Sequence, residues 1–321
     1  MTTMRAITMA EPGGPEVLEI TEVPHPVKVN AEFLVKVLAA SVNPIDTKTR
    51  AGRGVSGEIK SFPAILGNDF SGVVVESPYE AHSIKPGDEV YGMVMVPRFG
   101  GSYAEYVTVS SLSIAKKPRS ISHLEAAAVP LAALTAWGMV VEVAKAHEGQ
   151  RILIHAGAGG VGHFAVQFAK YFGAYVITTG SERNQTWLRE LGAHQVIDYT
   201  TSRFEDELAP VDVVIDLIGN TADDTGTRSL KVLRPGGLII NAPTGSWPTF
   251  LDDAAEAGVR ATSYKVAPDG STLAVISRLI ASGDLRVHVD EVFDLADAAD
   301  AHRAVETGHT RGKIVLRVAD F

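Results

Sequence analysis

The clearest chemical signal in the sequence is a run of small residues, Gly157-Ala-Gly-Gly-Val-Gly162, which satisfies the pattern G-x-G-x-x-G. It follows a strand-like segment at residues 151–155 and opens a helix-like segment at 161–172. In that setting small residues permit a tight turn, close approach of the backbone to a pyrophosphate, and close packing of helix on strand. The N–H groups that begin the helix then face the phosphates. A plain glycine-rich turn is the alternative, but the order strand, loop, helix, second strand favours a dinucleotide, held by Gly157, Ala158, Gly159, Gly160, Val161 and Gly162.

The residues that follow the second strand, predicted at 175–178, bear on the choice between NAD and NADP. An acidic residue at the strand end would bond the ribose 2′-OH, whereas a cation suits a 2′-phosphate. Glu182 lies past Gly180 and Ser181, beyond the expected strand end. Ser181 can donate a hydrogen bond and Arg183 can pair with a phosphate through two N–H groups. We therefore expect NADPH, with Ser181 and Arg183 at its 2′-phosphate; the alternative for Arg183 is a solvated residue in the first helical turn.

The elements that must position this loop alternate between strand and helix. After the second strand come a helix pattern at 184–191 and apolar strand-like runs at 195–197, 211–215, 238–241 and 259–264. Such alternation predicts a parallel, doubly wound α/β sheet. The first third of the chain instead has short β-like runs at 35–39, 72–76, 89–96 and 103–109. The last part predicts helices at 272–282 and 296–306 and a strand at 313–318.

Composition excludes several classes of function. The formal net charge of -9 disfavours nucleic acid and anionic membranes as main partners. The chain has no cysteine, which excludes disulfides, thiolate zinc sites and a cysteine nucleophile. No signal-peptide pattern opens the sequence, so we expect a cytoplasmic protein. Residues 126–141 carry no charge but are shorter than the ~20 residues of a membrane span and contain Pro130, which favours a buried helix.

Seven further segments occur in the order in which one protein family has them. They are Ser41-Val-Asn-Pro-Ile-Asp46, Gly67-Asn-Asp-Phe-Ser-Gly72, Lys85-Pro-Gly-Asp-Glu-Val-Tyr-Gly92, Pro130-Leu-Ala-Ala-Leu-Thr-Ala-Trp137, Leu191-Gly-Ala-His-Gln-Val-Ile-Asp-Tyr199, Leu233-Arg-Pro-Gly-Gly237 and Gly312-Lys-Ile-Val-Leu316. With the glycine loop, they make the chain resemble the medium-chain dehydrogenase/reductase superfamily, in its zinc-free quinone oxidoreductase branch, over nearly the whole length.

The resemblance implies a Rossmann domain inserted into a GroES-like, β-rich catalytic domain that both ends of the chain form. The expected limits are residues 1–124 and 267–321 for the catalytic domain and 125–266 for the NADP-binding domain, with the active site in the cleft. The resemblance also suggests a homodimer that pairs through the edge strand of the Rossmann sheet, predicted at 259–264.

The resemblance carries over to individual residues. It implies that Tyr199 lies by the adenosine 2′-phosphate, and that Asn43 and Asp46 lie near the nicotinamide. It places Thr135 at the nicotinamide as well. The remaining expected cofactor contacts are Ala242 and Pro243, at the carboxamide, and Lys313.

The departures from the family pattern concern zinc. Zinc-dependent relatives have Cys at the position of Asn43 and His-Glu at the positions of Asn68 and Asp69, and their second zinc needs four Cys. We therefore expect no metal, and without a Lewis acid alcohol dehydrogenase chemistry is disfavoured.

Some quinone oxidoreductases carry a Tyr after the first motif. Residues 50–60 contain none, so a proton donor of that kind is in doubt.

The resulting hypothesis is hydride transfer from NADPH to a quinone or an α,β-unsaturated carbonyl. Asn43 and Asn68 can donate hydrogen bonds to the acceptor oxygen, and Asp46 can do so only when protonated. Protonation from water is a plausible alternative. Two other functions stay open: an NADPH-binding structural or regulatory protein with little turnover, and an enoyl-thioester reductase.

Other polar and aromatic residues receive structural interpretations. We expect His155 in the core and His163 on a helix surface. Trp247 and Phe250 either flank the substrate or pack at the surface. Phe62, Tyr91 and Phe99 are expected in the core.

Overall fold

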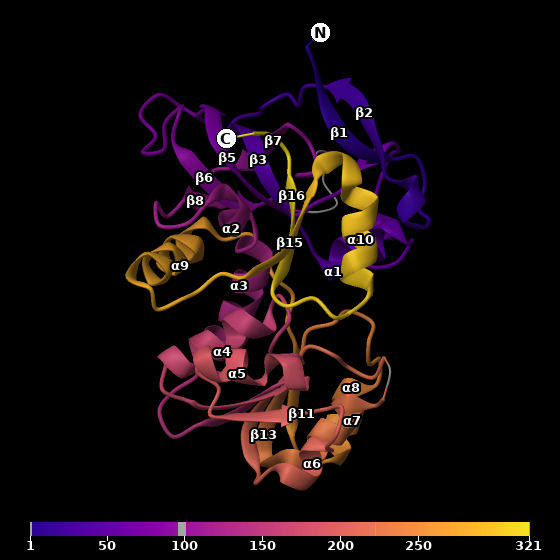
Figure 1. Ribbon diagram of the computed structural model, residues 1–321, viewed down its shortest axis with the longest axis vertical. Coiled ribbons are helices and arrows are strands. Elements are labelled where there is room, and N and C mark those ends of the chain that lie inside the picture. The colour runs from indigo at the N-terminus through magenta and orange to yellow at the C-terminus, as the bar shows by residue number, and fades with distance from the viewer. Residues whose placement is uncertain (1, 96–100, 222, 321) are drawn as a thin grey trace. The chain divides into compact units, whose positions relative to one another are not determined.

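The computed structural model describes residues 2–95, 101–221 and 223–320. The chain divides into two compact units (Figure 1). Unit 1 contains Met1–Leu134, Ala267–Gly283 and Val287–Phe321, so it joins both ends of the chain. Unit 2 contains Thr135–Val266 and Asp284–Arg286. Among the described residues, no helix combines the length and apolar character that crossing a membrane requires.

Unit 1 is built on a seven-stranded sheet in the order β15-β16-β3-β5-β6-β8, with β7 also paired to β3. A second sheet has the order β2-β1-β4. The strands are β1 (Thr3–Met9), β2 (Glu19–Pro24), β3 (Glu32–Val42), β4 (Ala64–Ile65), β5 (Asp69–Glu76), β6 (Glu89–Met93), β7 (Tyr106–Ser110), β8 (Ile114–Lys116), β15 (Val289–Asp294) and β16 (Lys313–Arg317). The helices are α1 (Pro44–Arg50), α2 (His123–Ala127), α9 (Gly270–Ser282) and α10 (Ala298–Glu306), with short turns η1 (Pro15–Val17), η2 (Ser56–Glu58) and η6 (Leu295–Asp297).

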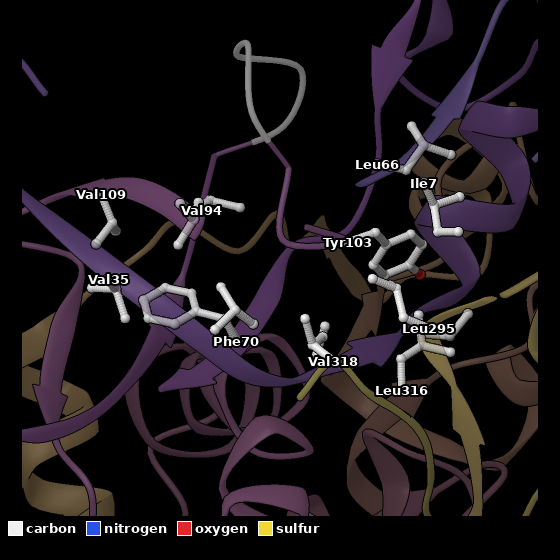
Figure 2. Packing of buried hydrophobic residues seen from close by; sticks show 14 of the residues in the cluster. Ile7, Val35, Leu66, Phe70, Val94, Tyr103, Val109, Leu295, Leu316 and Val318 are labelled. Atoms are coloured by element: carbon white, nitrogen blue, oxygen red, sulfur yellow. The ribbon is translucent and has the colours of Figure 1, made fainter. Parts of the chain in front are cut away.

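The core of unit 1 explains why β3 is its central strand. Nearly every residue of β3 is buried, on both faces, between β5 and β16. Phe70 lies beside Val35, and the ring of Tyr103 lies on the side of Ile7 and Leu295 (Figure 2). The C-terminal helix α10 lies along β15 and β16. The core therefore ties the two ends of the chain together.

Unit 2 contains a six-stranded parallel sheet in the order β11-β10-β9-β12-β13-β14. The elements are η3 (Gly138–Val143), β9 (Arg151–Ile154), α4 (Gly162–Tyr171), β10 (Tyr175–Gly180), η4 (Glu182–Asn184), α5 (Gln185–Glu190), β11 (Gln195–Asp198), α6 (Phe204–Glu207), β12 (Val211–Asp216), α7 (Thr225–Ser229), η5 (Leu230–Val232), β13 (Leu233–Asn241), α8 (Phe250–Glu256) and β14 (Arg260–Ser263). The strand order reverses between β9 and β12, which is the dinucleotide-binding arrangement of a doubly wound sheet. The predicted Rossmann fold is confirmed.

Some predicted elements differ in detail. The single helix expected at 126–141 is divided into α2, α3 (Pro130–Trp137) and the π-helical turn η3. Pro130 has no N–H group, so it begins a new helix rather than continuing α2. Strand β15, which pairs in parallel with β16, was not predicted because most of its residues are exposed and half are acidic.

The packing of Phe70 gives a test of the unit 1 core. Phe70 is fully buried on β5. We expect Phe70→Ala to lower the free energy of unfolding by about 3–5 kcal/mol, because it removes buried contacts and leaves a cavity. Urea denaturation measures this value. Val27→Ala, at a side chain that is 84% exposed, serves as the control and should change stability by less than about 0.5 kcal/mol. Equal effects of the two substitutions would contradict the assigned core.

Candidate functional site

The glycine loop of unit 2 joins β9 to α4, at the point where the strand order reverses. Gly157, Gly159 and Gly162 do not have positive φ; the only left-handed residue of this turn is Ala156, with φ 51°. Gly157 and Gly162 are instead needed because a side chain would not fit at either position. A Cβ at Gly162 would lie 2.1 Å from the carbonyl oxygen of Ala156, and one at Gly157 would lie 2.0 Å from the Thr178 hydroxyl. These two residues let helix and strand pack closely.

Gly159 is the exception in this loop. A Cβ built there meets only the Ala156 oxygen, at 3.3 Å, so its side is open toward the outside of the loop. In the first turn of α4, the N–H groups of His163 and Ala165 donate to the carbonyl oxygens of Gly159 and Val161, both at 3.0 Å. The open backbone surface at Gly159, at the start of a helix, fits a pyrophosphate.

The other predicted cofactor residues of unit 2 follow neighbouring strands at one edge of the sheet. Ser181 and Arg183 follow β10, and Tyr199 follows β11, whose residue Asp198 pairs with Gly180. Arg183 and Tyr199 are exposed, and Ser181 is half-buried. Because carboxyl ends of parallel strands meet at one edge, the structure brings these residues to the edge that carries the glycine loop.

Two further predicted residues lie at that same edge. Ala242 and Pro243 follow β13, and the N–H of Ala242 donates to the carbonyl of Asp216 at 3.0 Å. Asn241 ends the strand and donates to the Asp216 carboxylate at 2.8 Å, which fixes the start of this loop. Thr135 is buried on α3 at the first residue of unit 2.

The predicted catalytic residues of unit 1 form one buried cluster. Asn43 caps α1, and its backbone N–H donates to Asp46 Oδ2 at 2.8 Å. The side-chain amide of Asn68 donates to Asp46 Oδ1 at 2.6 Å. Pro44 follows the cap, where its missing N–H costs nothing. The structure thus brings Asn43, Asp46 and Asn68 together around a single carboxyl group.

Asp69 is the second carboxyl group of this cluster, and sequence reasoning did not assign it a role. Its Oδ2 accepts hydrogen bonds from the Ser41 hydroxyl and the Asn43 amide, both at 2.8 Å. Its Oδ1 accepts from the backbone N–H of Leu131 at 2.8 Å. The available signal was its position beside Asn68 in the segment Gly67-Asn-Asp-Phe-Ser-Gly72. Asp69 holds the Asn43 amide in place.

Lys313 places a positive charge next to these two carboxyl groups. Its ammonium donates to the carbonyl of Val42 and to Oδ1 of Asn43, and it lies 3.9 Å from Asp69 Oδ2. The residue is 3% exposed. Sequence comparison suggested that Lys313 binds the cofactor. The structure places it in unit 1 with its ammonium in this cluster, and the cofactor role stays a prediction.

The charges of the cluster are strongly perturbed by burial. Burial, together with the nearby Asp69 carboxylate, raises the pKa of Asp46 to about 7. Burial also raises the pKa of Asp69, against the opposing effect of the Lys313 charge. Asp69 is the carboxyl closer to the ammonium, so it is the better carboxylate. Asp46 is the group that holds a proton near neutral pH.

A zinc ion does not fit this cluster. The ammonium of Lys313 already lies beside Asn43 Oδ1 and Asp69, and it would repel a second cation. Within the described parts of the chain, no three His, Cys, Asp or Glu side chains are grouped closely enough to hold a metal ion.

Several side chains outside the site correct or confirm earlier expectations. His155 is in the core as predicted, with its ring nitrogens 2.8 Å from Ser229 Oγ and 3.3 Å from Thr179 Oγ1. The expectation for His163 is wrong, since it is fully buried where α4 packs on η3 and the sheet. Trp247 is also buried, in the core of unit 2, and its indole N–H donates to Asp253.

The remaining aromatic predictions have mixed outcomes. Phe250 begins α8 and packs partly buried against the core that contains Trp247. Tyr91 is fully buried as predicted, whereas Phe62 is 41% exposed and the prediction for it is wrong. Phe99 lies outside the described residues.

Comparisons with known proteins identify relatives for both units. Residues 30–119 match the alcohol dehydrogenase GroES-like domain, and residues 191–316 match the zinc-binding dehydrogenase family. The chain is similar to the quinone oxidoreductase of Coxiella burnetii, whose structure has a TM-score of 0.93 and 40% identity over 99% of this chain and 100% of that one.

Curated relatives agree with the structural match. The mitochondrial NAD(P)H oxidoreductase RTN4IP1 of Danio rerio is 34% identical over 90% of this chain and 84% of the relative. The chloroplastic NADPH-dependent alkenal/one oxidoreductase of Arabidopsis thaliana is also 34% identical, over 98% of this chain and 79% of the relative.

The glycine loop yields a prediction that separates packing from binding. In Gly159→Ala the added methyl group meets only the Ala156 oxygen, in a tight contact of 3.3 Å, so stability should fall by less than about 1 kcal/mol. We expect NADPH affinity to fall at least roughly tenfold, because the methyl group lies where the pyrophosphate approaches. Gly162→Ala should instead destabilise the protein by about 1–3 kcal/mol, since its Cβ meets backbone. Urea denaturation and isothermal titration with NADPH measure both effects; unchanged affinity in Gly159→Ala would remove the loop from the cofactor site.

Proposed function

Because the chain belongs to the medium-chain dehydrogenase/reductase superfamily, in its zinc-free quinone oxidoreductase branch, we propose that it is an NADPH-dependent reductase of quinones or α,β-unsaturated carbonyls. The observation that carries the proposal is the buried cluster of unit 1, in which an ammonium and amides surround two carboxyl groups where zinc-dependent relatives hold a metal. Such a cluster can stabilise charge on an acceptor but does not activate an alcohol through a metal.

Unit 2 supports the cofactor assignment. NADPH supplies a hydride from C4 of its nicotinamide when it is bound. We assign the pyrophosphate to the loop Gly157-Ala-Gly-Gly-Val-Gly162, the 2′-phosphate to Ser181, Arg183 and Tyr199, and the nicotinamide end to Thr135, Ala242 and Pro243. Residues 125–266 are then the NADP-binding domain, and residues 1–124 and 267–321 the catalytic domain.

Asn43 and Asn68 are the proposed donors to the acceptor oxygen. Each side-chain amide carries two N–H groups. One N–H of Asn43 is directed to Asp69 and one of Asn68 to Asp46, and these bonds fix the plane of each amide. Donors that are oriented in advance stabilise negative charge without reorganising during the reaction.

We also propose a homodimer and a cytoplasmic location. Strand β14 is the outer strand of the unit 2 sheet, and an unpaired sheet edge is a ready surface for pairing with a second copy. Light scattering tests the dimer: a monomeric mass would refute it.

The Danio rerio relative is named mitochondrial, so cell fractionation is the test of location.

The choice of cofactor can be tested with Arg183. We expect oxidation of NADPH, well above NADH, in the presence of 1,4-benzoquinone, 9,10-phenanthrenequinone or a simple enone. Arg183→Ala should reduce the preference for NADPH roughly tenfold to a hundredfold, because a charged hydrogen bond to the phosphate is lost. The rate with NADH should stay the same. NADH used as well as NADPH by the parent protein would disprove the 2′-phosphate site, and NADPH binding without turnover would favour a non-catalytic protein.

Asn43 gives a test of the catalytic cluster. We expect Asn43→Ala to lower kcat roughly 100-fold, because a donor to the acceptor oxygen is removed. The affinity for NADPH should change less than kcat. Gln150→Ala is the control, since it removes a buried amide of unit 2 that donates to the carbonyl of Ala144 at 3.2 Å, just before β9 and at the other end of that strand from the glycine loop. Acceptor reduction at the parent rate in Asn43→Ala would exclude Asn43 from the mechanism.

A further inference from the structure

A line of polar side chains in unit 1 connects Asp46 to the C-terminal helix α10. The Tyr103 hydroxyl lies 3.3 Å from Asp46 Oδ2 and 3.3 Å from His302 Nε2. On the other side of the ring, His302 Nδ1 lies 3.5 Å from Arg50 Nη1. Arg50 Nη2 lies 2.6 Å from Glu306 Oε1, whose side chain is 34% exposed. The line thus runs from a buried carboxyl to a partly exposed one.

The donor and acceptor capacities of these groups fix the direction of each hydrogen bond in the line. An arginine side chain can only donate, so the nitrogen of His302 that faces Arg50 must accept. The proton of the neutral imidazole then lies on Nε2, which donates to the Tyr103 oxygen. The Tyr103 hydroxyl is left to donate to Asp46. Burial and the Arg50 charge lower the pKa of His302 to about 3, so the ring is neutral and carries this single proton.

The line ends at the one carboxyl of the cluster that can gain or lose a proton near neutral pH. Asp46 is 1% exposed. The titratable groups that face it are Asp69 from β5, which favours its protonated form, Lys313 from β16, which favours its charged form, and Tyr103. A hydrogen bond donated by Tyr103 also favours the charged form. Tyr103 therefore opposes the effect of burial on Asp46.

Building on the proposed function, we propose that Tyr103 and His302 are positioning residues that orient and polarise the Asp46 carboxyl, and that Asp46 gives a proton to the acceptor after hydride addition. Tyr103 itself is not the donor. Burial and the charge of Asp46 hold the pKa of Tyr103 well above its usual value, so it keeps its proton.

The proposed step balances for an enone. The hydride forms a C–H bond at the β-carbon with its electron pair, and the electrons of the C=C bond move toward the carbonyl oxygen. The proton of Asp46 then bonds the α-carbon, and the O–H electron pair stays on Asp46 as a carboxylate. A proton from water restores the acid. Each turnover consumes one NADPH, one enone and one proton, and yields one ketone and one NADP⁺.

The first experiment measures the Asp46 proton directly, without cofactor or acceptor. The infrared band of a protonated carboxyl, assigned by its loss in Asp46→Asn, is followed as a function of pH. In Tyr103→Phe the ring remains in the core but the donor is gone, so we expect the midpoint to rise by about half to one pH unit. His302→Leu removes the donor behind Tyr103 and should move the midpoint in the same direction by a smaller amount.

Tyr91→Phe is the matched control for this titration. Tyr91 is also fully buried in unit 1, but its hydroxyl bonds Leu273 O and Ser277 Oγ, both at 2.8 Å. It should leave the Asp46 midpoint unchanged. Equal midpoints in Tyr103→Phe and Tyr91→Phe would overturn the positioning role of Tyr103.

The second experiment measures kcat for an enone against pH. Only the acid form of Asp46 donates a proton, so kcat should fall as pH rises through the Asp46 midpoint near 7. In Tyr103→Phe the fall should move to higher pH by the shift that the infrared titration gives. Asp46→Asn should lose this pH dependence and lower kcat at least roughly 100-fold. A pH profile in Tyr103→Phe that superimposes on the parent's would overturn the donor role of Asp46. If the parent reduces none of the acceptors, the proposed function fails and the donor role with it, while the infrared titration still decides the positioning role.

Discussion

The constraint on which the unit 1 site depends is the balance of buried charge. One ammonium, Lys313, and two carboxyl groups, Asp46 and Asp69, are each 3% exposed or less. An isolated buried charge is costly, so each charge needs a partner or must be neutralised. The ammonium lies beside Asp69, which takes the charge, and Asp46 keeps a proton more readily than an exposed aspartate does. The chemistry of the site follows from this unequal division.

The fold produces this arrangement through strand register. Ser41 pairs with Asp69 across β3 and β5, and Ile314 pairs with Val42 across β16 and β3. Lys313 precedes Ile314 and Asn43 follows Val42 in these antiparallel strands, so residues far apart in the sequence meet at the end of one sheet. In unit 2, the residues that we propose bind the pyrophosphate and the 2′-phosphate likewise follow the carboxyl ends of β9, β10 and β11.

The sequence was informative where local pattern determines structure. The glycine loop, its flanking strand and helix, and the apolar strands of unit 2 were all predicted, because a parallel sheet buried on both faces produces continuous apolar runs. Exposed elements such as β15 leave weaker patterns, and His163 was misplaced because one polar residue does not reveal that a helix is covered on both sides.

The site was less predictable than the fold. Asn43, Asp46 and Asn68 were identified through short motifs, but Tyr103, His302 and Arg50 join them only through long-range packing. Arg50 and His302 are 252 positions apart, and no local pattern links them. Residues 50–60 lack the tyrosine that some relatives carry, and the structure supplies a tyrosine hydroxyl to the cluster from position 103 instead.

In the proposed reaction, hydride reaches the β-carbon of the conjugated acceptor rather than its carbonyl carbon. Reduction of a simple enone with NADPH that carries deuterium at both C4 positions, followed by NMR of the product, tests this. The account predicts a saturated ketone that carries the label on the carbon β to the carbonyl and none on the α-carbon. An allylic alcohol labelled at the former carbonyl carbon, or a saturated ketone without label, would contradict it.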